Sequence, residues 1–191
     1  MNAKQLRLAL LAGGLSISTS LWAAGPTPAM LSNTCSACHG GFGQSVGPST
    51  PTLAGQPAAF ISDAMKKFKS GERPGTVMGR IAKGYTDEDF NAMGEFFSKQ
   101  KFVRYPQVVD AAKVAKGKEL HNQGCNICHQ ENGRQPGVGG VIAGQWLAYL
   151  LITGNDFHAK KRPLPKGMDE KFASLSKDDV EALMHFYASQ Q

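Results

Sequence analysis

Several features that would point to common functional classes are missing from the sequence. Beyond residue 24, no stretch approaches the roughly 20 consecutive apolar residues that a membrane-spanning helix requires, so we expect no stable membrane insertion. Neither glycine-rich segment, 40–43 or 137–140, completes the G-x-G-x-x-G pattern of a nucleotide-binding loop. The formal net charge of +6 comes without an arginine-rich or aromatic-interleaved patch, so no nucleic acid partner is expected.

Cysteine is also scarce, and its few copies are confined to two short motifs. The chain has four cysteines, in Cys35–His39 (CSACH) and, 90 positions later, in Cys125–His129 (CNICH). In a C-x-x-C-H motif the two thiols can add across the vinyl groups of one haem, and the histidine is placed to give the iron its proximal nitrogen ligand. The sequence therefore predicts a covalent dihaem c-type cytochrome. Its predicted contacts are haem links at Cys35, Cys38, Cys125 and Cys128, and iron ligands at His39 and His129.

Three other interpretations of the cysteines explain less. A structural zinc site would take its ligand pairs from motifs far apart and would leave both following histidines unexplained. Redox-active C-x-x-C pairs need no following histidine and usually belong to a strand-rich, thioredoxin-like context, which we do not find. Structural disulfides are awkward across a two-residue gap, because a stabilising crosslink should close a long loop.

The N-terminus has the features of a secretory signal. Lys4 and Arg7 are basic, residues 8–22 are mostly apolar, and the small pair Ala23-Ala24 follows. We expect residues 1–24 to be removed and the mature chain to be periplasmic, in keeping with haem attachment outside the cytoplasm. An uncleaved membrane anchor is the alternative, although glycines and serines interrupt the apolar stretch.

The two halves of the sequence repeat one pattern. Met78 and Met168 each lie 43 residues after the first cysteine of their motif, and an Ala-Gly-Gln run follows each motif at almost the same distance. We therefore expect a first domain at 25–100, a linker at 101–109 and a second domain at 110–191. Since no segment alternates as a strand does, the predicted class is all-α, with two tandem class I cytochrome c-like domains, each wrapped around one covalent haem.

Each domain is predicted to contain three helices. The first, at about Thr27 to His39 and about Asp110 to His129, carries the motif at its C-terminal end. The second follows the Gly-Gln pair and has one apolar face. The third begins at Thr86 and at Ser176, where a hydroxyl side chain precedes acidic residues, as is typical of a helix N-terminus.

Met78 and Met168 are predicted to be the second axial ligands of the two irons. They hold equal repeat positions in loops between the second and third helices, and a methionine ligand suits a centre that passes single electrons. The methionines that lie on apolar helical faces are interpreted instead as core residues; they are Met65, Met93 and Met184.

The other histidines are His121, His158 and His185, all in the second half. We interpret His185 as a packed or rim residue rather than a ligand, because the apolar face of the last helix flanks it. Each proximal histidine is expected to need a carbonyl or carboxylate that orients its other ring nitrogen. The loops that can present such a carbonyl contain Pro48 or Pro51, and Pro136.

The two-domain layout resembles the cytochrome c4 group, and several stretches are more similar to the dihaem cytochrome subunit of flavocytochrome c sulfide dehydrogenase from sulfur-oxidising bacteria. The similar stretches are 53–56 (LAGQ), 68–72 (FKSGE), 78–85 (MGRIAKGY), 143–146 (AGQW) and 186–191 (FYASQQ). The resemblance implies His39/Met78 and His129/Met168 as axial pairs. It also implies a heterodimer with an FAD-binding sulfide dehydrogenase subunit, with FAD on that partner only. The chain would not be an enzyme by itself and would pass electrons to a downstream cytochrome or oxidase.

Two other functions stay open. A free-standing cytochrome c4-type carrier would deliver electrons to a terminal oxidase without a permanent flavoprotein partner. A dihaem peroxidase-type enzyme would need a vacant or displaceable sixth iron position, and the paired Met78 and Met168 argue against it.

Overall fold

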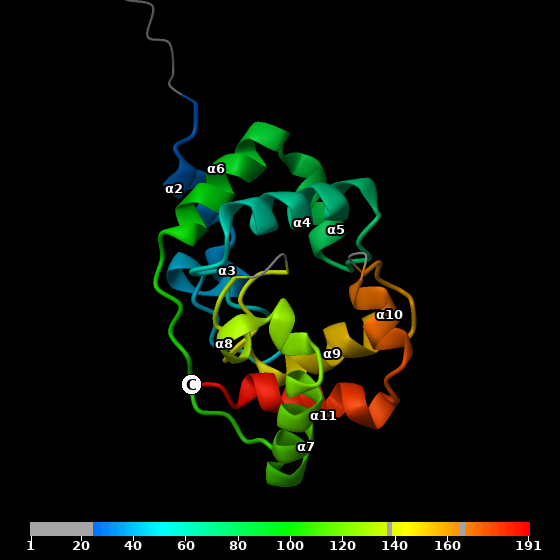
Figure 1. The fold of residues 1–191 in the computed structure, drawn as a ribbon. Helices are drawn as coiled ribbons and strands as arrows, with labels where there is room; N and C mark the ends of the chain where they lie inside the picture. Colours follow the sequence, from blue (N-terminus) through cyan, green and yellow to red (C-terminus); the bar gives the residue numbers. More distant parts are fainter. Residues whose placement is uncertain (1–24, 137–138, 165–166) are drawn as a thin grey trace, which may run out of the picture.

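The computed structural model describes residues 25–136, 139–164 and 167–191, so the expected signal segment lies outside the described residues. Helices form two lobes that follow each other along the chain, and an extended segment joins them (Figure 1). The first lobe contains α2 (Pro28–Asn33), α3 (Ser36–His39), η1 (Gly41–Gly43), α4 (Ala58–Ser70), α5 (Met78–Ile81), η2 (Ala82–Gly84) and α6 (Asp87–Ser98). The second contains α7 (Ala111–Asn122), η3 (Cys125–Ile127), α8 (Gln130–Gly133), α9 (Leu147–His158), α10 (Met168–Ala173) and α11 (Lys177–Ala188). Within the described ranges, no helix is both long and apolar enough to cross a membrane.

Each lobe has its own apolar core, as expected for two tandem domains. The first core is formed mainly by α4 and α6, and the second by α7, α9 and α11. Met65 and Met93 are buried in the first lobe and Met184 in the second, which confirms their interpretation as core residues. The third helix of each domain packs against two other helices of its lobe, α6 against α4 and α2, and α11 against α7 and α9.

The third helix begins where the sequence predicts in both domains. Thr86 Oγ1 accepts a hydrogen bond from the Asp89 amide, and the Asp89 carboxylate accepts one from the Thr86 amide. Ser176 and Asp179 form the same capping box at α11. Hydrogen bonds from Lys116 and Ser176 lower the pKa of Asp179 to about 2. Each hydroxyl cap is worth about 1 kcal/mol, and this local stabilisation explains why the start was visible in the sequence.

The first helix of each domain is shorter than predicted. In the first domain α2 ends at Asn33, because the Thr34 hydroxyl donates to the Leu31 carbonyl (2.7 Å) and competes with helical hydrogen bonding. In the second domain α7 ends at Asn122, and Gly124 has a φ of 154° that an L-residue side chain rarely allows. The predicted continuous helices through His39 and His129 are therefore wrong, and the motif residues lie in separate short helices, α3 and η3.

The two lobes are joined by a reciprocal pair of glutamines. Gln56 donates to the Val141 carbonyl (2.8 Å) and accepts from the Val141 amide (2.9 Å). Gln145, its repeat equivalent, donates to the Thr52 carbonyl (3.0 Å) and accepts from the Thr52 amide (2.9 Å). Both side chains are only 3% exposed. Because buried amides are costly to leave unpaired, these four bonds hold the lobes in one arrangement.

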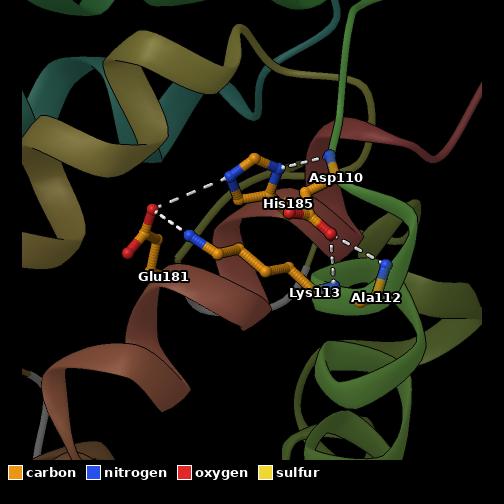
Figure 2. Close-up of polar contacts among 5 residues, drawn as sticks. All are labelled: Asp110, Ala112, Lys113, Glu181 and His185. Atoms are coloured by element: carbon orange, nitrogen blue, oxygen red, sulfur yellow. Dashed lines mark hydrogen bonds and ion pairs between the residues drawn. The ribbon is translucent and has the colours of Figure 1, made fainter.

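The extended connection between α6 and α7 is anchored at its end by a polar cluster on α11 (Figure 2). The Asp110 carboxylate caps the amides of Ala112 and Lys113, and the Asp110 amide donates to His185 Nδ1 at 3.1 Å. Lys113 and the other ring nitrogen of His185 both reach Glu181. His185 is 9% exposed, which confirms that it is a packed residue.

We expect the free energy of unfolding to fall as the pH drops below about 6.5, in part because of His185. Burial and the charge of Lys113 lower the pKa of His185, although Glu181 and Asp110 oppose this. The folded state therefore takes up the proton at lower pH than the unfolded state, and the contribution present above pH 6.5 is lost as the pH falls through the window below it. Denaturant titrations at several pH values should show that the free energy of unfolding changes less steeply with pH in His185→Gln than in the wild type. His158→Gln, at an exposed position, is the control and should keep the slope. Equal slopes in wild type and His185→Gln would contradict this assignment.

Candidate functional site

The first motif is held in a turn that presents one buried imidazole and two free thiols. Cys35 is half-buried and packs against the first core, whereas Cys38 is exposed. His39 is 7% exposed, and its Nδ1 lies 2.8 Å from the Pro51 carbonyl oxygen. Since a carbonyl only accepts, Nδ1 carries the proton and Nε2 keeps its lone pair free. Burial lowers the pKa of His39, although the Pro51 bond opposes this.

The prediction of an orienting carbonyl is thus confirmed at Pro51. Pro48 has a different role, because its carbonyl accepts from the Tyr149 amide of the second lobe (3.2 Å). Met78 is the first residue of α5, is half-buried, and packs against the same core as Cys35. The structure therefore brings the predicted cysteine and methionine of the first site to one apolar cluster.

The second motif has a different backbone but the same set of side chains. Cys125 begins η3 and packs against the second core, and Cys128 is exposed. The His129 ring lies 6.0 Å from the Tyr187 ring between centroids. His129 Nδ1 is buried without a hydrogen-bond partner among the described residues, so the carbonyl expected from the Pro136 loop is not observed; residues 137–138 lie outside the description.

Met168 occupies the same place in its domain as Met78 does in the first. It is the first residue of α10, follows Gly167, and is half-buried. The described contacts do not join Met168 to Cys125 or His129. The second site is therefore less completely assembled than the first in this structure.

The donor set fits covalent haem and does not fit the other interpretations of the cysteines. All four thiols are free, which is contrary to structural disulfides. Cys35 and Cys125 pack against different cores, and within the described ranges no three His, Cys, Asp or Glu side chains converge as a zinc site requires. Each lobe instead offers two thiols followed by a histidine, buried at His39 and half-buried at His129, the chemistry that thioether links and an iron–nitrogen bond need.

Known proteins resemble most of the chain in sequence and in structure. The family model described as cytochrome c matches residues 27–101. The cytochrome c4 of Stutzerimonas stutzeri is 30% identical over 178 residues, covering 80% of this chain and 82% of that protein. The crystal structure of reduced recombinant cytochrome c4 from Pseudomonas stutzeri aligns with a TM-score of 0.70 at 28% identity and covers 83% of this chain and 94% of that one. The chain belongs to the cytochrome c4-like family of dihaem cytochromes c.

A shorter match concerns the cytochrome subunit of sulfide dehydrogenase from Chlorobaculum tepidum. It is 43% identical over 68 residues, which cover 36% of this chain and 61% of that subunit. As a cytochrome c4-like protein, the chain is an electron carrier with covalently bound haem c and is not itself catalytic.

One feature of this cytochrome c4-like chain was missed in the sequence, although the repeat carried its signal. Arg73 and Arg162 hold equivalent repeat positions, and each guanidinium lies over a phenylalanine ring, Phe68 at 4.4 Å and Phe157 at 4.5 Å. Arg73 donates to the Tyr149 hydroxyl across the lobe boundary (3.3 Å). Burial alone would raise the pKa of Tyr149, but the two arginines bring it below its usual value. Two cations thus converge between the lobes.

Proposed function

We propose that Cys35, Cys38, Cys125 and Cys128 link the two haems, with His39/Met78 and His129/Met168 as axial pairs. The free thiols beside a buried His39 and a half-buried His129, and the equal positions of the two methionines, support this assignment. The proposal includes two domains, 25–100 and 110–191, joined by the linker 101–109. It also includes a periplasmic location and the removal of residues 1–24. When bound, each haem supplies a reversible one-electron couple.

Residues of the chain fix the orientation of the proposed ligand His39 and the arrangement of the two lobes. The Pro51 carbonyl holds the proton of His39 on Nδ1, so that Nε2 would be available to the haem iron as a neutral donor. The reciprocal bonds of Gln56 and Gln145 keep the two lobes from rotating against each other. A fixed separation between two electron sites keeps the rate of exchange between them constant.

We further propose that the chain accepts electrons from an FAD-containing sulfide dehydrogenase subunit and passes them to a downstream cytochrome or oxidase. The observation that carries this proposal is a cationic cavity of about 410 Å³ beside Met78. Its charged lining residues are all basic, namely Lys69, Arg73, Arg80 and Lys83. The cavity lies within and beside 78–85, a stretch that resembles the sulfide dehydrogenase subunits.

The cavity has the chemistry of a docking surface for an acidic partner. Arg80 uses Nε to donate to the Thr76 carbonyl (3.1 Å), which fixes the side chain and leaves its terminal nitrogens available. Lys83 is exposed on η2. Uniform charge at a partly concave surface attracts an oppositely charged partner and orients it. An acidic flavoprotein docked there would be next to the proposed ligand Met78.

A second function is favoured by a different observation. Similarity to cytochrome c4 extends over most of this chain and most of that protein, whereas the match to the sulfide dehydrogenase subunit covers about a third of the chain. A free-standing carrier that delivers electrons to a terminal oxidase is therefore the alternative. The two functions differ in whether a flavoprotein binds persistently.

Charge reversal at the cavity separates these possibilities. In Arg80→Glu/Lys83→Glu, reduction of the haems by sulfide and the cognate flavoprotein should slow by about tenfold at low ionic strength, because attraction becomes repulsion. Dithionite-reduced spectra should stay unchanged. Lys118→Glu/Lys177→Glu, with the same charge change on exposed positions of the second lobe, is the control and should retain the rate. An unaltered rate in the first variant would place the interface elsewhere. A wild-type chain that binds no flavoprotein would favour the free carrier.

A further inference from the structure

The third helix of the first lobe is less covered than its repeat equivalent in the second lobe. α6 and α11 hold equal repeat positions. Ala182 and Phe186 of α11 are 0% and 2% exposed, whereas the equivalent residues of α6 are half-buried. Among the described residues, this side of α6 is therefore partly open where the same side of α11 is buried. We call it the α6 face, and its residues are Asp89, Ala92, Glu95 and Phe96.

In the second lobe, the first two turns of α7 cover this side of α11. Gly117 lies so close to α11 that a Cβ there would clash with its backbone. Lys116 forms an ion pair with Asp179 at 2.7 Å. The Asp110 amide, just before α7, donates to His185 Nδ1 at 3.1 Å. A small residue at the crossing, a basic side chain and a helix N-terminus thus cover this side together.

α2 packs against α6 (Figure 1), but it lacks these two turns. It begins at Pro28, seven residues before its motif, whereas α7 begins at Ala111, fourteen residues before its own. Thr27 is the N-cap, and Pro26 and Pro28 disfavour a helical turn upstream, because proline lacks the amide donor and restricts the residue before it. Residues 21–27, at the repeat positions of the missing turns, contain no basic side chain.

The α6 face has carboxylates that the described part of the chain does not pair with a cation. Asp89 uses Oδ2 in the capping box of α6, and no described contact uses its Oδ1. The equivalent Asp179 uses Oδ1 to bind Lys116. Glu95 is exposed and belongs to none of the described ion pairs. Lys99 follows one turn later, so this region keeps a net negative charge and suits a basic partner.

An exposed aromatic side chain extends the apolar part of the α6 face. Phe42 is 68% exposed, and its ring stacks on Phe96 with 6.4 Å between centroids. Its φ of 56° is a left-handed conformation that is costly for a bulky residue. The second copy has Asn132 at this position with a φ of 58°, which asparagine tolerates better. The first lobe thus holds an exposed ring in a strained position beside the open face.

We infer that the α6 face is a docking surface for a lysine-bearing helix of a partner protein. The contacts of α7 on α11 show which helix it fits. A small residue at the crossing allows close approach to Ala92 and Phe96, the helix N-terminus meets the Glu95 carboxylate, and a lysine about two turns later meets Asp89. This helix has the opposite charge to the acidic surface proposed for the cationic cavity, so the inference does not depend on the flavoprotein.

A peptide with the sequence of α7 tests the inference on the full, haem-loaded chain. It spans residues 110–122 and carries a side-chain crosslink between positions 118 and 122, which are exposed in α7, because so short a helix is marginal alone. Fluorescence anisotropy of a dye on the peptide measures the dissociation constant. We expect binding that weakens at high salt. A peptide with Lys113→Glu/Lys116→Glu should bind about tenfold more weakly.

Variants of the chain locate the binding. Glu95→Lys should weaken binding of the peptide by about tenfold, and a peptide with Ala111→Glu in its first turn should regain part of that loss. Phe42→Asn, which introduces the residue of the second copy, should also weaken binding. Glu170→Lys, with the same charge change at an exposed position of the second lobe, is the control and should bind like wild type. Far-UV circular dichroism and haem content verify that each variant is folded.

Three results would overturn the inference. The first is a wild-type chain that does not bind the peptide. The second is equal affinity in wild type, Glu95→Lys and Phe42→Asn, because binding would then lie elsewhere. The third is a concentration-dependent dimer in sedimentation that Glu95→Lys or Phe42→Asn dissolves, because a second copy of the chain would then occupy the α6 face.

Discussion

Met78→Ala and Met168→Ala are each expected to remove about half of the sulfur-to-iron charge-transfer absorption of the oxidised protein and to open one iron to carbon monoxide. The two methionines lie at equal repeat positions and each begins a short helix, α5 or α10. Removing a methionine sulfur should leave the sixth position of its iron open. In the first domain no other histidine can take that position, because His39 is the single histidine of the first half. Absorption spectra with and without carbon monoxide check the result.

The controls separate ligand loss from packing loss. Met78→Leu and Met168→Leu remove the sulfur while nearly conserving the side-chain volume, so each should lower the free energy of unfolding by less than about 1.5 kcal/mol. Each should still lose about half of the charge-transfer band, as the alanine variants do. Met65→Leu and Met184→Leu make the same change at buried core positions, one in each lobe, and should keep the full band. A full band in either Met78 variant would show that the first iron has another ligand.

The sequence was most informative where the determining interactions are local. The capping boxes at Thr86 and Ser176 each join residues three positions apart, so the starts of α6 and α11 were visible without tertiary information. Covalent motifs and repeat offsets likewise depend on spacing alone. The Pro51 carbonyl lies 12 residues from His39, and the sequence narrowed it only to a small set of prolines.

Interactions between distant segments were not predictable in the same way. Gln56 and Gln145 were recognised as repeat positions, yet their reciprocal bonds join residues 85 and 93 positions apart. The first helices were predicted to run unbroken into the motifs, but the Thr34 hydroxyl bond in the first domain and the backbone at Gly124 in the second end them earlier. The His121–Tyr187 pair was detectable in principle, because comparison of the two copies shows both positions changing from apolar to polar. The sequence could not show that the two side chains form a hydrogen bond, with His121 Nδ1 3.1 Å from the Tyr187 hydroxyl.

Gly117→Ala is expected to destabilise the second lobe by about 3 kcal/mol or more. Alanine normally favours a helix over glycine by about 1 kcal/mol, so the sign of the effect depends on packing. A Cβ at position 117 would lie 2.2 Å from the Ala182 carbonyl oxygen and 2.7 Å from Phe186 Cβ. Because the nearest atom is backbone, α7 and α11 must move apart. Gly117 therefore sets the close approach of the two helices that build the second core.

The loss should be confined largely to the second half of the chain. α11 carries Tyr187, which packs beside His129, so loosening α11 should expose the second motif first. Denaturant unfolding gives the free energy, and limited proteolysis shows which half is cut. Gly84→Ala, where nothing lies within 4 Å of the added Cβ, is the control and should unfold like wild type. Equal resistance of both halves in Gly117→Ala would contradict two semi-independent domains, and unchanged stability would show that α7 and α11 can separate at little cost.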